Sequence, residues 1–139
     1  MGMKDSSFDL GYVEEICRVK KDICPNWAYL TGADHHVASM VNMGGDGGVV
    51  CGSNIFPEAF VRFYEGAVEE NVEKERRALE KIEALKAIYA DGRFFQATKT
   101  ALSVLGICED NFAPPLLPLE YAEREKIEEI MLTVHKMKL

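Results

Sequence analysis

Short apolar runs alternate with amphipathic stretches over the first half of the chain, and this alternation restricts the fold more than any other feature. Residues 27–30 are apolar and stop at Thr31-Gly32, and the apolar run 48–52 has a glycine at each end. Both are typical of short buried strands, and residues 1–4 fit the end of another strand. Because consecutive parallel strands need connections of roughly a dozen residues, the pattern predicts an α/β fold with parallel strands rather than antiparallel hairpins.

Three amphipathic stretches accompany these strands. Apolar residues recur at near-helical spacing from Leu10 to Val19, and Asp9 can cap that helix. A second helix is predicted from Asp34 to Met43, where Gly44 suits the left-handed position just past a helix end. A third begins at Pro57, because proline is favoured in the first helical turn. The predicted order is strand then helix, repeated three times.

The C-terminal half reads as helical. A charged helix with one apolar face covers residues 73–89, a second apolar stripe runs from Phe94 to its stop at Gly106, and a last helix follows the proline-rich segment 114–118. The charged helix is only about two and a half heptads long, shorter than a coiled coil requires. We therefore expect these helices to pack on a core.

The chain divides near Asn71. We predict that residues 1–71 hold three parallel strands alternating with helices and that residues 72–139 form a three-helix C-terminal layer. A chain of 139 residues has room for one moderate core, since domains commonly run to ~100–150 residues.

Charge and hydropathy exclude two classes of partner. The net charge is −7, and the lysines and arginines are dispersed among glutamates. No basic stripe is present to neutralise phosphates, so we expect no nucleic-acid binding. No apolar run reaches the ~18–20 residues that span a bilayer, and no signal peptide is recognisable, so we expect no membrane association.

The cysteines and histidines indicate neither a metal nor a redox site. The four cysteines are well separated, which fits neither a zinc knuckle nor a dithiol motif. They read as reduced thiols of a cytoplasmic protein. His35 and His36 are adjacent, so on a helix they point in different directions, and no carboxylate at ligand spacing accompanies them.

Three strand-end motifs carry a resemblance to a known family. They are Gly2-Met3-Lys4, Gly32-Ala33-Asp34, and the glycine-rich segment 44–54 that leads to Asn54 and Pro57. In this order and spacing the chain resembles the C-terminal part of the dihydrodipicolinate synthase and N-acetylneuraminate lyase family, class I pyruvate-dependent aldolases that include 2-keto-3-deoxygluconate aldolase.

The resemblance implies a fold. The family has an eight-stranded (β/α)8 TIM barrel followed by helices, and the match begins at the sixth strand. It implies that this chain supplies barrel strands six to eight, then the helical layer, without the N-terminal half. Unpaired sheet edges favour association, so we expect a homo-oligomer or association with the missing N-terminal half. The sequence leaves open whether Met1 is the natural start.

The resemblance also implies a mechanism. Lys4 matches the lysine that forms a Schiff base with pyruvate or a 2-keto-3-deoxy sugar acid, and no cofactor is implied. The attacking amine must be neutral, whereas a lysine in water, with a pKa of ~10.4, is almost fully charged at pH 7. Burial inside an intact barrel normally lowers the pKa of such a lysine. We therefore expect this chain, alone, to be inactive or very weak.

The other candidate site residues match substrate-binding positions of the family. These are Gly32 and Asp34, which shape the substrate pocket, Val49, which lines the pyruvate site, and Cys51. Asp34 could instead serve only as a helix cap. Cys51 stands where neuraminate lyases have a serine and His35 where they have a glutamate, and these departures argue against sialic-acid cleavage.

Several functions remain open at this point. The first is a fragment of an aldolase or lyase acting on pyruvate or sugar acids, and a dihydrodipicolinate synthase fragment is the alternative within the family. The second is a non-catalytic half-barrel that acts as a scaffold or interaction protein. A third, a helical-bundle binding module, requires residues 1–71 to be mostly helical.

Overall fold

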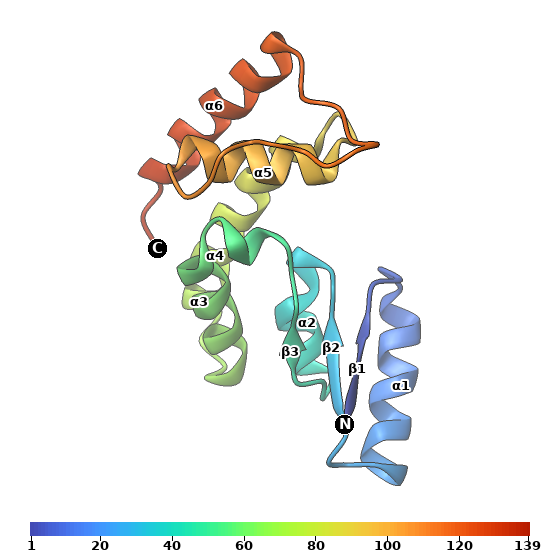
Figure 1. Ribbon diagram of the computed structural model, residues 1–139. Helices are drawn as coiled ribbons and strands as arrows, with labels where there is room; N and C mark the ends of the chain where they lie inside the picture. The colour runs from blue at the N-terminus through green and yellow to red at the C-terminus, as the bar shows by residue number, and fades with distance from the viewer.

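A three-stranded parallel sheet organises the N-terminal part of the protein. The computed structural model describes residues 1–139, and its strands are β1 (Gly2–Asp5), β2 (Ala28–Thr31) and β3 (Gly47–Gly48). The strand order is β1-β2-β3, and both neighbouring pairs are parallel (Figure 1). The predicted alternation of parallel strands with helices is confirmed, and the presence of parallel strands counts against the helical-bundle binding module.

The third strand is much shorter than predicted. Residues 48–52 were expected to be a strand, but ladder pairing with β2 ends at Gly48, opposite Thr31. The Val49 N–H still donates to Thr31 O at 2.8 Å, and the chain then turns into the short 3₁₀ helix η2 (Gly52–Asn54). Glycine has no side chain that could pack on the sheet, and its backbone turns easily. This segment therefore leaves the sheet early.

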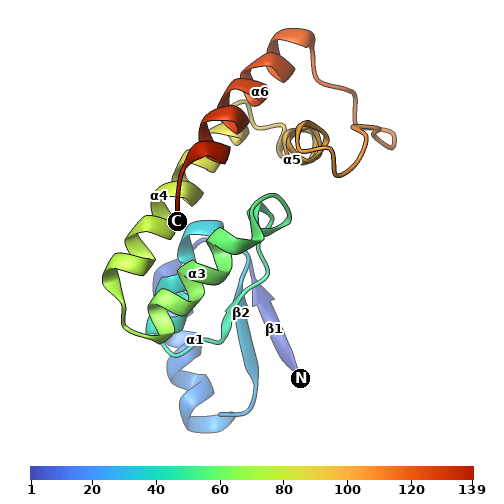
Figure 2. The same cartoon turned by 90° about the vertical axis from the view of Figure 1, so that its left-hand side faces the viewer.

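Two helices cover one face of the sheet. They are α1 (Leu10–Ile23) and α2 (Val37–Asn42), the latter preceded by the 3₁₀ turn η1 (Asp34–His36). Figure 2 shows both on the same side of the strands, with β1 at an edge of the molecule. A small buried cluster joins the two helices to the sheet; its members are Val13, Cys17, Tyr29 and Met40.

An ion pair between a buried lysine and an exposed aspartate holds α1 against the entry to β3. Lys20 is only 8% exposed, and its Nζ lies 3.1 Å from Asp46 Oδ2. The same carboxylate accepts the Tyr29 N–H at 2.7 Å. Burial alone would raise the pKa of Asp46, but the Tyr29 N–H and Lys20 outweigh it and leave that pKa below its ordinary value. Asp46 therefore links the glycine-rich segment to both α1 and β2.

The next two helices form a close antiparallel pair. They are α3 (Pro57–Val68) and α4 (Val72–Lys86), and α4 continues into the 3₁₀ turn η3 (Ala87–Tyr89). A Cβ at Gly66 would lie 2.7 Å from the backbone nitrogen of Glu75. Only glycine allows the two backbones to approach this closely.

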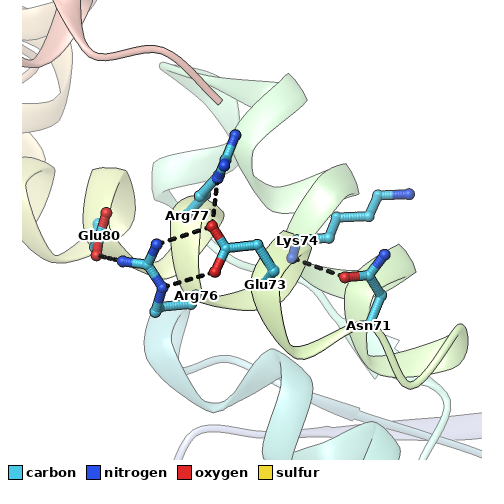
Figure 3. A network of polar contacts seen from close by, with 6 residues as sticks. All are labelled: Asn71, Glu73, Lys74, Arg76, Arg77 and Glu80. Carbon is cyan, nitrogen blue, oxygen red and sulfur yellow. Dashed lines mark hydrogen bonds and ion pairs between the residues drawn. The ribbon is translucent and has the colours of Figure 1, made fainter.

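Polar side chains fix the start of α4 (Figure 3). Asn71 caps the helix by accepting the N–H of Lys74 at 3.0 Å. Glu73 forms ion pairs with Arg76 and Arg77, and the hydrogen bonds from both arginines lower the pKa of Glu73 to about 2. These side chains are exposed, so their ion pairs contribute little to stability, and the cap is the main local determinant of where the helix begins.

The last two helices complete a continuous core. They are α5 (Phe94–Val104) and α6 (Tyr121–Lys136), as predicted from the apolar stripes. One apolar cluster runs from α2 to α6; it contains Val37, Ala38, Val50, Ile55, Phe56, Ala59, Phe60, Phe63, Ala67, Ala78, Ile82, Leu85, Ile88, Ala97, Ala101, Ile127, Met131 and Val134. None of the helices combines the length and apolar content needed to cross a bilayer.

Candidate active site at the strand ends

Lys4 lies at the carboxyl end of β1, directly beside Gly32. Residue 4 pairs with Leu30 in the ladder, and its exposed side chain alternates with the half-buried Met3 and Asp5. The Gly32 N–H donates to Asp5 O at 2.6 Å. A Cβ on Gly32 would stand 2.8 Å from Lys4 Cε and 3.0 Å from Lys4 Nζ. The amine therefore crosses the strand end at a position that only glycine leaves clear.

Asp5 is held by its neighbours and fixes the strand end behind Lys4. Its carboxylate accepts the Ser7 N–H at 2.8 Å and the Tyr29 hydroxyl at 3.1 Å. Burial opposes ionisation of Asp5, but the bonds from Ser7 and Tyr29 outweigh it and lower its pKa. The Tyr29 pKa is raised, first by burial and then by Asp5. These bonds fix the turn through which the chain leaves β1.

Asp34 reaches across to the segment after β3. Its carboxylate accepts the Gly52 N–H at 3.2 Å, whereas no side-chain bond caps its own turn. The interpretation of Asp34 as a simple helix cap is therefore wrong. Burial raises the pKa of Asp34, and the N–H groups of Gly52 and Cys51 oppose this shift only in part. The carboxylate ties the segment after β2 to the segment after β3.

Cys51 faces the C-terminal helices. Its Sγ lies 3.5 Å from Thr98 Oγ1 on α5, and Thr98 Oγ1 lies 3.3 Å from the Tyr89 hydroxyl. Burial raises the pKa of Tyr89, and Cys51 and Asp34 act in the same direction. The phenol therefore stays protonated. Sequence reasoning missed Thr98 and Tyr89, because no local pattern relates them to residue 51.

Val49 occupies the same edge of the sheet. Its side chain is 55% exposed, and its backbone is held to Thr31. The structure thus brings the predicted residues together in two contacts, Lys4 with Gly32 and Asp34 with the segment that follows Cys51. Ser6 also lies beside Gly32, although the sequence did not indicate it as a site residue. A Cβ on Gly32 would lie 2.2 Å from Ser6 Oγ.

Three aromatic rings lie close together after the strand ends, Phe8 from the segment after β1 and His35 and His36 from η1 after β2. The rings of His35 and His36 are 4.2 Å apart between centroids, and the Phe8 ring lies 6.3 Å from each. Phe8 has a backbone φ of 61°, a left-handed value that residues other than glycine rarely adopt. No group of three or more histidine, cysteine or acidic residues is arranged to hold a metal ion.

Comparisons with known proteins show the family and the fold of the chain. The family model of the dihydrodipicolinate synthetase family matches residues 1–134. A dihydrodipicolinate synthase structure from Bacteroides thetaiotaomicron is 36% identical over 96% of the chain, with a TM-score of 0.90. A probable 2-dehydro-3-deoxy-D-pentonate aldolase of Escherichia coli is 25% identical over 96% of the chain. The Escherichia coli protein YagE, solved in complex with pyruvate, has a TM-score of 0.87 at 20% identity over 97% of the chain, which shows a shared fold.

These matches cover only part of each relative. The chain spans 44% of the length of the pentonate aldolase and 46% of each of the two solved chains.

Proposed function

The chain belongs to the dihydrodipicolinate synthetase family, and from this premise we propose that residues 1–139 carry the imine-forming side of a class I aldolase or lyase site. Residues 1–71 correspond to strands six to eight of a (β/α)8 barrel with their helices, and residues 72–139 to the helical layer that follows it. The observation that carries the proposal is the Lys4 amine lying over Gly32 at the carboxyl end of a parallel strand, the end at which barrel active sites lie.

The substrate class follows from the relatives. Their names and ligands include pyruvate, 2-dehydro-3-deoxy-D-pentonate and 2-keto-3-deoxygluconate. We assign pyruvate or a 2-keto-3-deoxy sugar acid to this site. The neutral Lys4 amine attacks the keto carbon and water leaves, giving an imine. In a 2-keto-3-deoxy sugar acid, water then takes the proton of the hydroxyl on carbon 4, the bond between carbons 3 and 4 breaks, and the aldehyde departs. The electron pair of that bond moves to the imine and gives an enamine. Protonation of the enamine at carbon 3 and hydrolysis release pyruvate and restore the Lys4 amine.

The remaining strand-end residues surround that imine. Gly32 leaves room for the amine, and Val49 offers an apolar surface to the pyruvate methyl carbon. We assign Asp34 and Cys51 to the hydroxyl-bearing tail of a sugar acid, as the family resemblance implies. Dihydrodipicolinate synthase chemistry remains the alternative reaction, since it begins with the same imine.

Activity of residues 1–139 alone is proposed to be very weak. Lys4 is exposed to water, and water stabilises the charged amine that cannot attack a carbonyl. The same exposure favours the second candidate function, a non-catalytic half-barrel scaffold.

We also propose that the sheet edges drive association. Strands β1 and β3 each pair only with β2, so each presents an unpaired edge, which is a template for further pairing. We expect a homo-oligomer, or a complex with a chain that supplies the other strands. Light scattering that finds only monomer at micromolar concentration contradicts this.

Trapping with borohydride tests the catalytic proposal. Incubation with pyruvate and borohydride should add one reduced pyruvate adduct, which mass spectrometry maps to Lys4. The adduct should vanish in Lys4→Ala and persist in Lys21→Ala, a matched change of an exposed lysine on α1. No adduct, even after mixing with the N-terminal half-barrel of a relative, overturns the enzyme proposal in favour of the scaffold.

A further inference from the structure

The Tyr29 hydroxyl reaches diagonally across the first two strands. Tyr29 lies on the central strand β2 opposite Met3, but its hydroxyl donates to Asp5 Oδ2 at 3.1 Å, further along β1. The residue is fully buried, its ring stacks on Trp27 at 5.8 Å between centroids, and it belongs to the small cluster that joins α1 and α2 to the sheet. The hydroxyl therefore holds a fixed place beside the end of β1.

Strand β1 has few other side-chain contacts that fix its position along β2. It is an edge strand of four residues with no fully buried side chain, and within it only Met3 packs against an apolar cluster. Side chains alternate between the two faces, so a slip of β1 by two residues keeps every side chain on its own face. Such a slip moves each residue by about 6.6 Å. The alternation alone does not distinguish the two registers, whereas the bond from Tyr29 to Asp5 does.

Asp5 passes this constraint to Lys4. The two residues are adjacent on a strand, so their side chains point to opposite faces of the sheet. The Asp5 carboxylate meets the Tyr29 hydroxyl on one face and also accepts the Ser7 N–H at 2.8 Å. The Asp5 carbonyl accepts the Gly32 N–H at 2.6 Å, and the Lys4 amine lies beside the same glycine. Holding Asp5 in register thus holds Lys4 at Gly32.

We infer that Tyr29 is a positioning residue for Lys4. Through Asp5, its hydroxyl sets the register of β1, and this register places the Lys4 amine over Gly32. The role rests on the proposed function, since it matters for chemistry only where Lys4 forms the imine. Tyr29 itself packs among the residues beneath α1 and α2. A residue on the helix-covered face of the sheet thereby controls whether the amine stands where pyruvate can meet it.

Nuclear magnetic resonance tests the register directly. In the unsubstituted chain the Lys4 ε protons should show a nuclear Overhauser contact with the Gly32 α protons, because a Cβ on Gly32 would lie 2.8 Å from Lys4 Cε. Tyr29→Phe removes only the hydroxyl and should abolish this contact. A contact that is absent from the unsubstituted chain, or that survives in Tyr29→Phe, overturns the inference. If Tyr29→Phe does not fold, Asp5→Ala decides in the same way.

Two further variants separate loss of this bond from a general loss of folding. Asp5→Asn keeps a carbonyl oxygen that can accept from Tyr29, and it should keep the Overhauser contact. Tyr12→Phe is the matched removal of a tyrosine hydroxyl, since Tyr12 is exposed on α1, and it should keep the contact as well. If either variant loses the contact as Tyr29→Phe does, the loss is not specific to this bond and the inference is overturned.

The consequence for Lys4 is tested by trapping with pyruvate and borohydride. Tyr29→Phe should lower the yield of the reduced adduct by about 3- to 10-fold, the effect of one lost hydrogen bond, and Tyr12→Phe should not. Where Gly32→Ala has already displaced the Lys4 side chain, adding Tyr29→Phe should lower the yield little further, because both changes disturb the same contact. Losses that multiply indicate a general structural role and overturn the inference. Absence of any pyruvate adduct in the unsubstituted chain overturns the proposed function, and the Overhauser contact then decides the register by itself.

Discussion

The amine of Lys4 lies across the end of β2, where a Cβ on Gly32 would stand only 3.0 Å from its Nζ. The first prediction follows from this contact. Gly32→Ala should displace the Lys4 side chain and lower the borohydride-trapped pyruvate adduct at least ~10-fold, in any preparation where the unsubstituted chain forms it. The clashing atoms are ends of flexible side chains, so the free energy of unfolding should change by less than ~1 kcal/mol.

A second substitution, at Ser6, distinguishes displacement of the Lys4 side chain from a general loss of folding. Ser6 Oγ is the atom closest to the added methyl group, at 2.2 Å. Adding Ser6→Ala to Gly32→Ala should therefore recover part of the adduct yield. Gly11→Ala on α1, where the nearest neighbour of a Cβ is Asp9 Oδ1 at 3.3 Å, should leave the yield unchanged. A Gly32→Ala protein that traps pyruvate as well as the unsubstituted chain contradicts the prediction.

The second prediction concerns the pH dependence of stability. Burial raises the pKa of Asp34 above its ordinary 3.8, so the native state holds this proton more tightly than the unfolded state. Asp34 therefore favours folding most at low pH, and this contribution is lost as pH rises from about 3.8 through the native pKa. Asp34→Asn keeps a carbonyl acceptor for Gly52 and does not ionise.

Urea unfolding of both proteins between pH 3 and 7 measures this difference. Relative to Asp34→Asn, the unsubstituted chain should lose stability as pH rises and then reach a plateau. If the difference in free energy of unfolding between the two proteins is constant with pH, or changes in the opposite direction, a raised pKa of Asp34 is not the cause.

The third prediction concerns the ion pair between the buried Lys20 and the exposed Asp46, whose two partners should differ in what their loss costs. The Lys20 side chain is 10% exposed and that of Asp46 is 41% exposed. Asp46→Ala leaves the Tyr29 N–H without its partner and the buried Lys20 cation with only the Gly44 carbonyl, which should cost about 1–3 kcal/mol. Lys20→Met leaves a carboxylate that water can reach, and should cost less than ~1 kcal/mol. Denaturant unfolding at pH 7 tests the order, and equal losses contradict it.

Local patterns were sufficient for part of this structure. The alternation of strands and helices was predictable because apolar periodicity is set by neighbouring residues. That Lys4 and Gly32 lie at the ends of successive parallel strands was predictable from the strand pattern and the family resemblance, whereas the close approach of the Lys4 side chain to Gly32 was not predicted. The length of the third strand was not predictable, because Gly47 and Gly48 permit pairing without enforcing it.

Long-range polar contacts were beyond the sequence. The bond from Gly52 to Asp34 joins residues 18 positions apart, and the Thr98 contact with Cys51 joins residues that no periodicity relates. Such contacts depend on how α5 packs against the strand ends. The burial of Lys20 was equally hidden, since lysine is rarely buried unless it is paired.

The last prediction concerns backbone strain at Phe8. Its φ of 61° is a left-handed conformation that costs a residue with a Cβ roughly 1–2 kcal/mol. The Phe8 side chain is 60% exposed, so packing on His35 and His36 offsets little of that cost. Phe8→Ala keeps the strain and Phe8→Gly removes it.

We therefore expect Phe8→Gly to be more stable than Phe8→Ala by about 1 kcal/mol, although glycine is ordinarily ~0.5–1 kcal/mol less stable than alanine within helices and strands. Urea unfolding of the two variants measures the difference directly. Glu70 offers a matched site, because its φ of 53° lies in the same region at the end of α3. The glycine variant should be more stable than the alanine variant there as well. If the alanine variant is as stable as the glycine variant, or more stable, at both sites, neither backbone is strained.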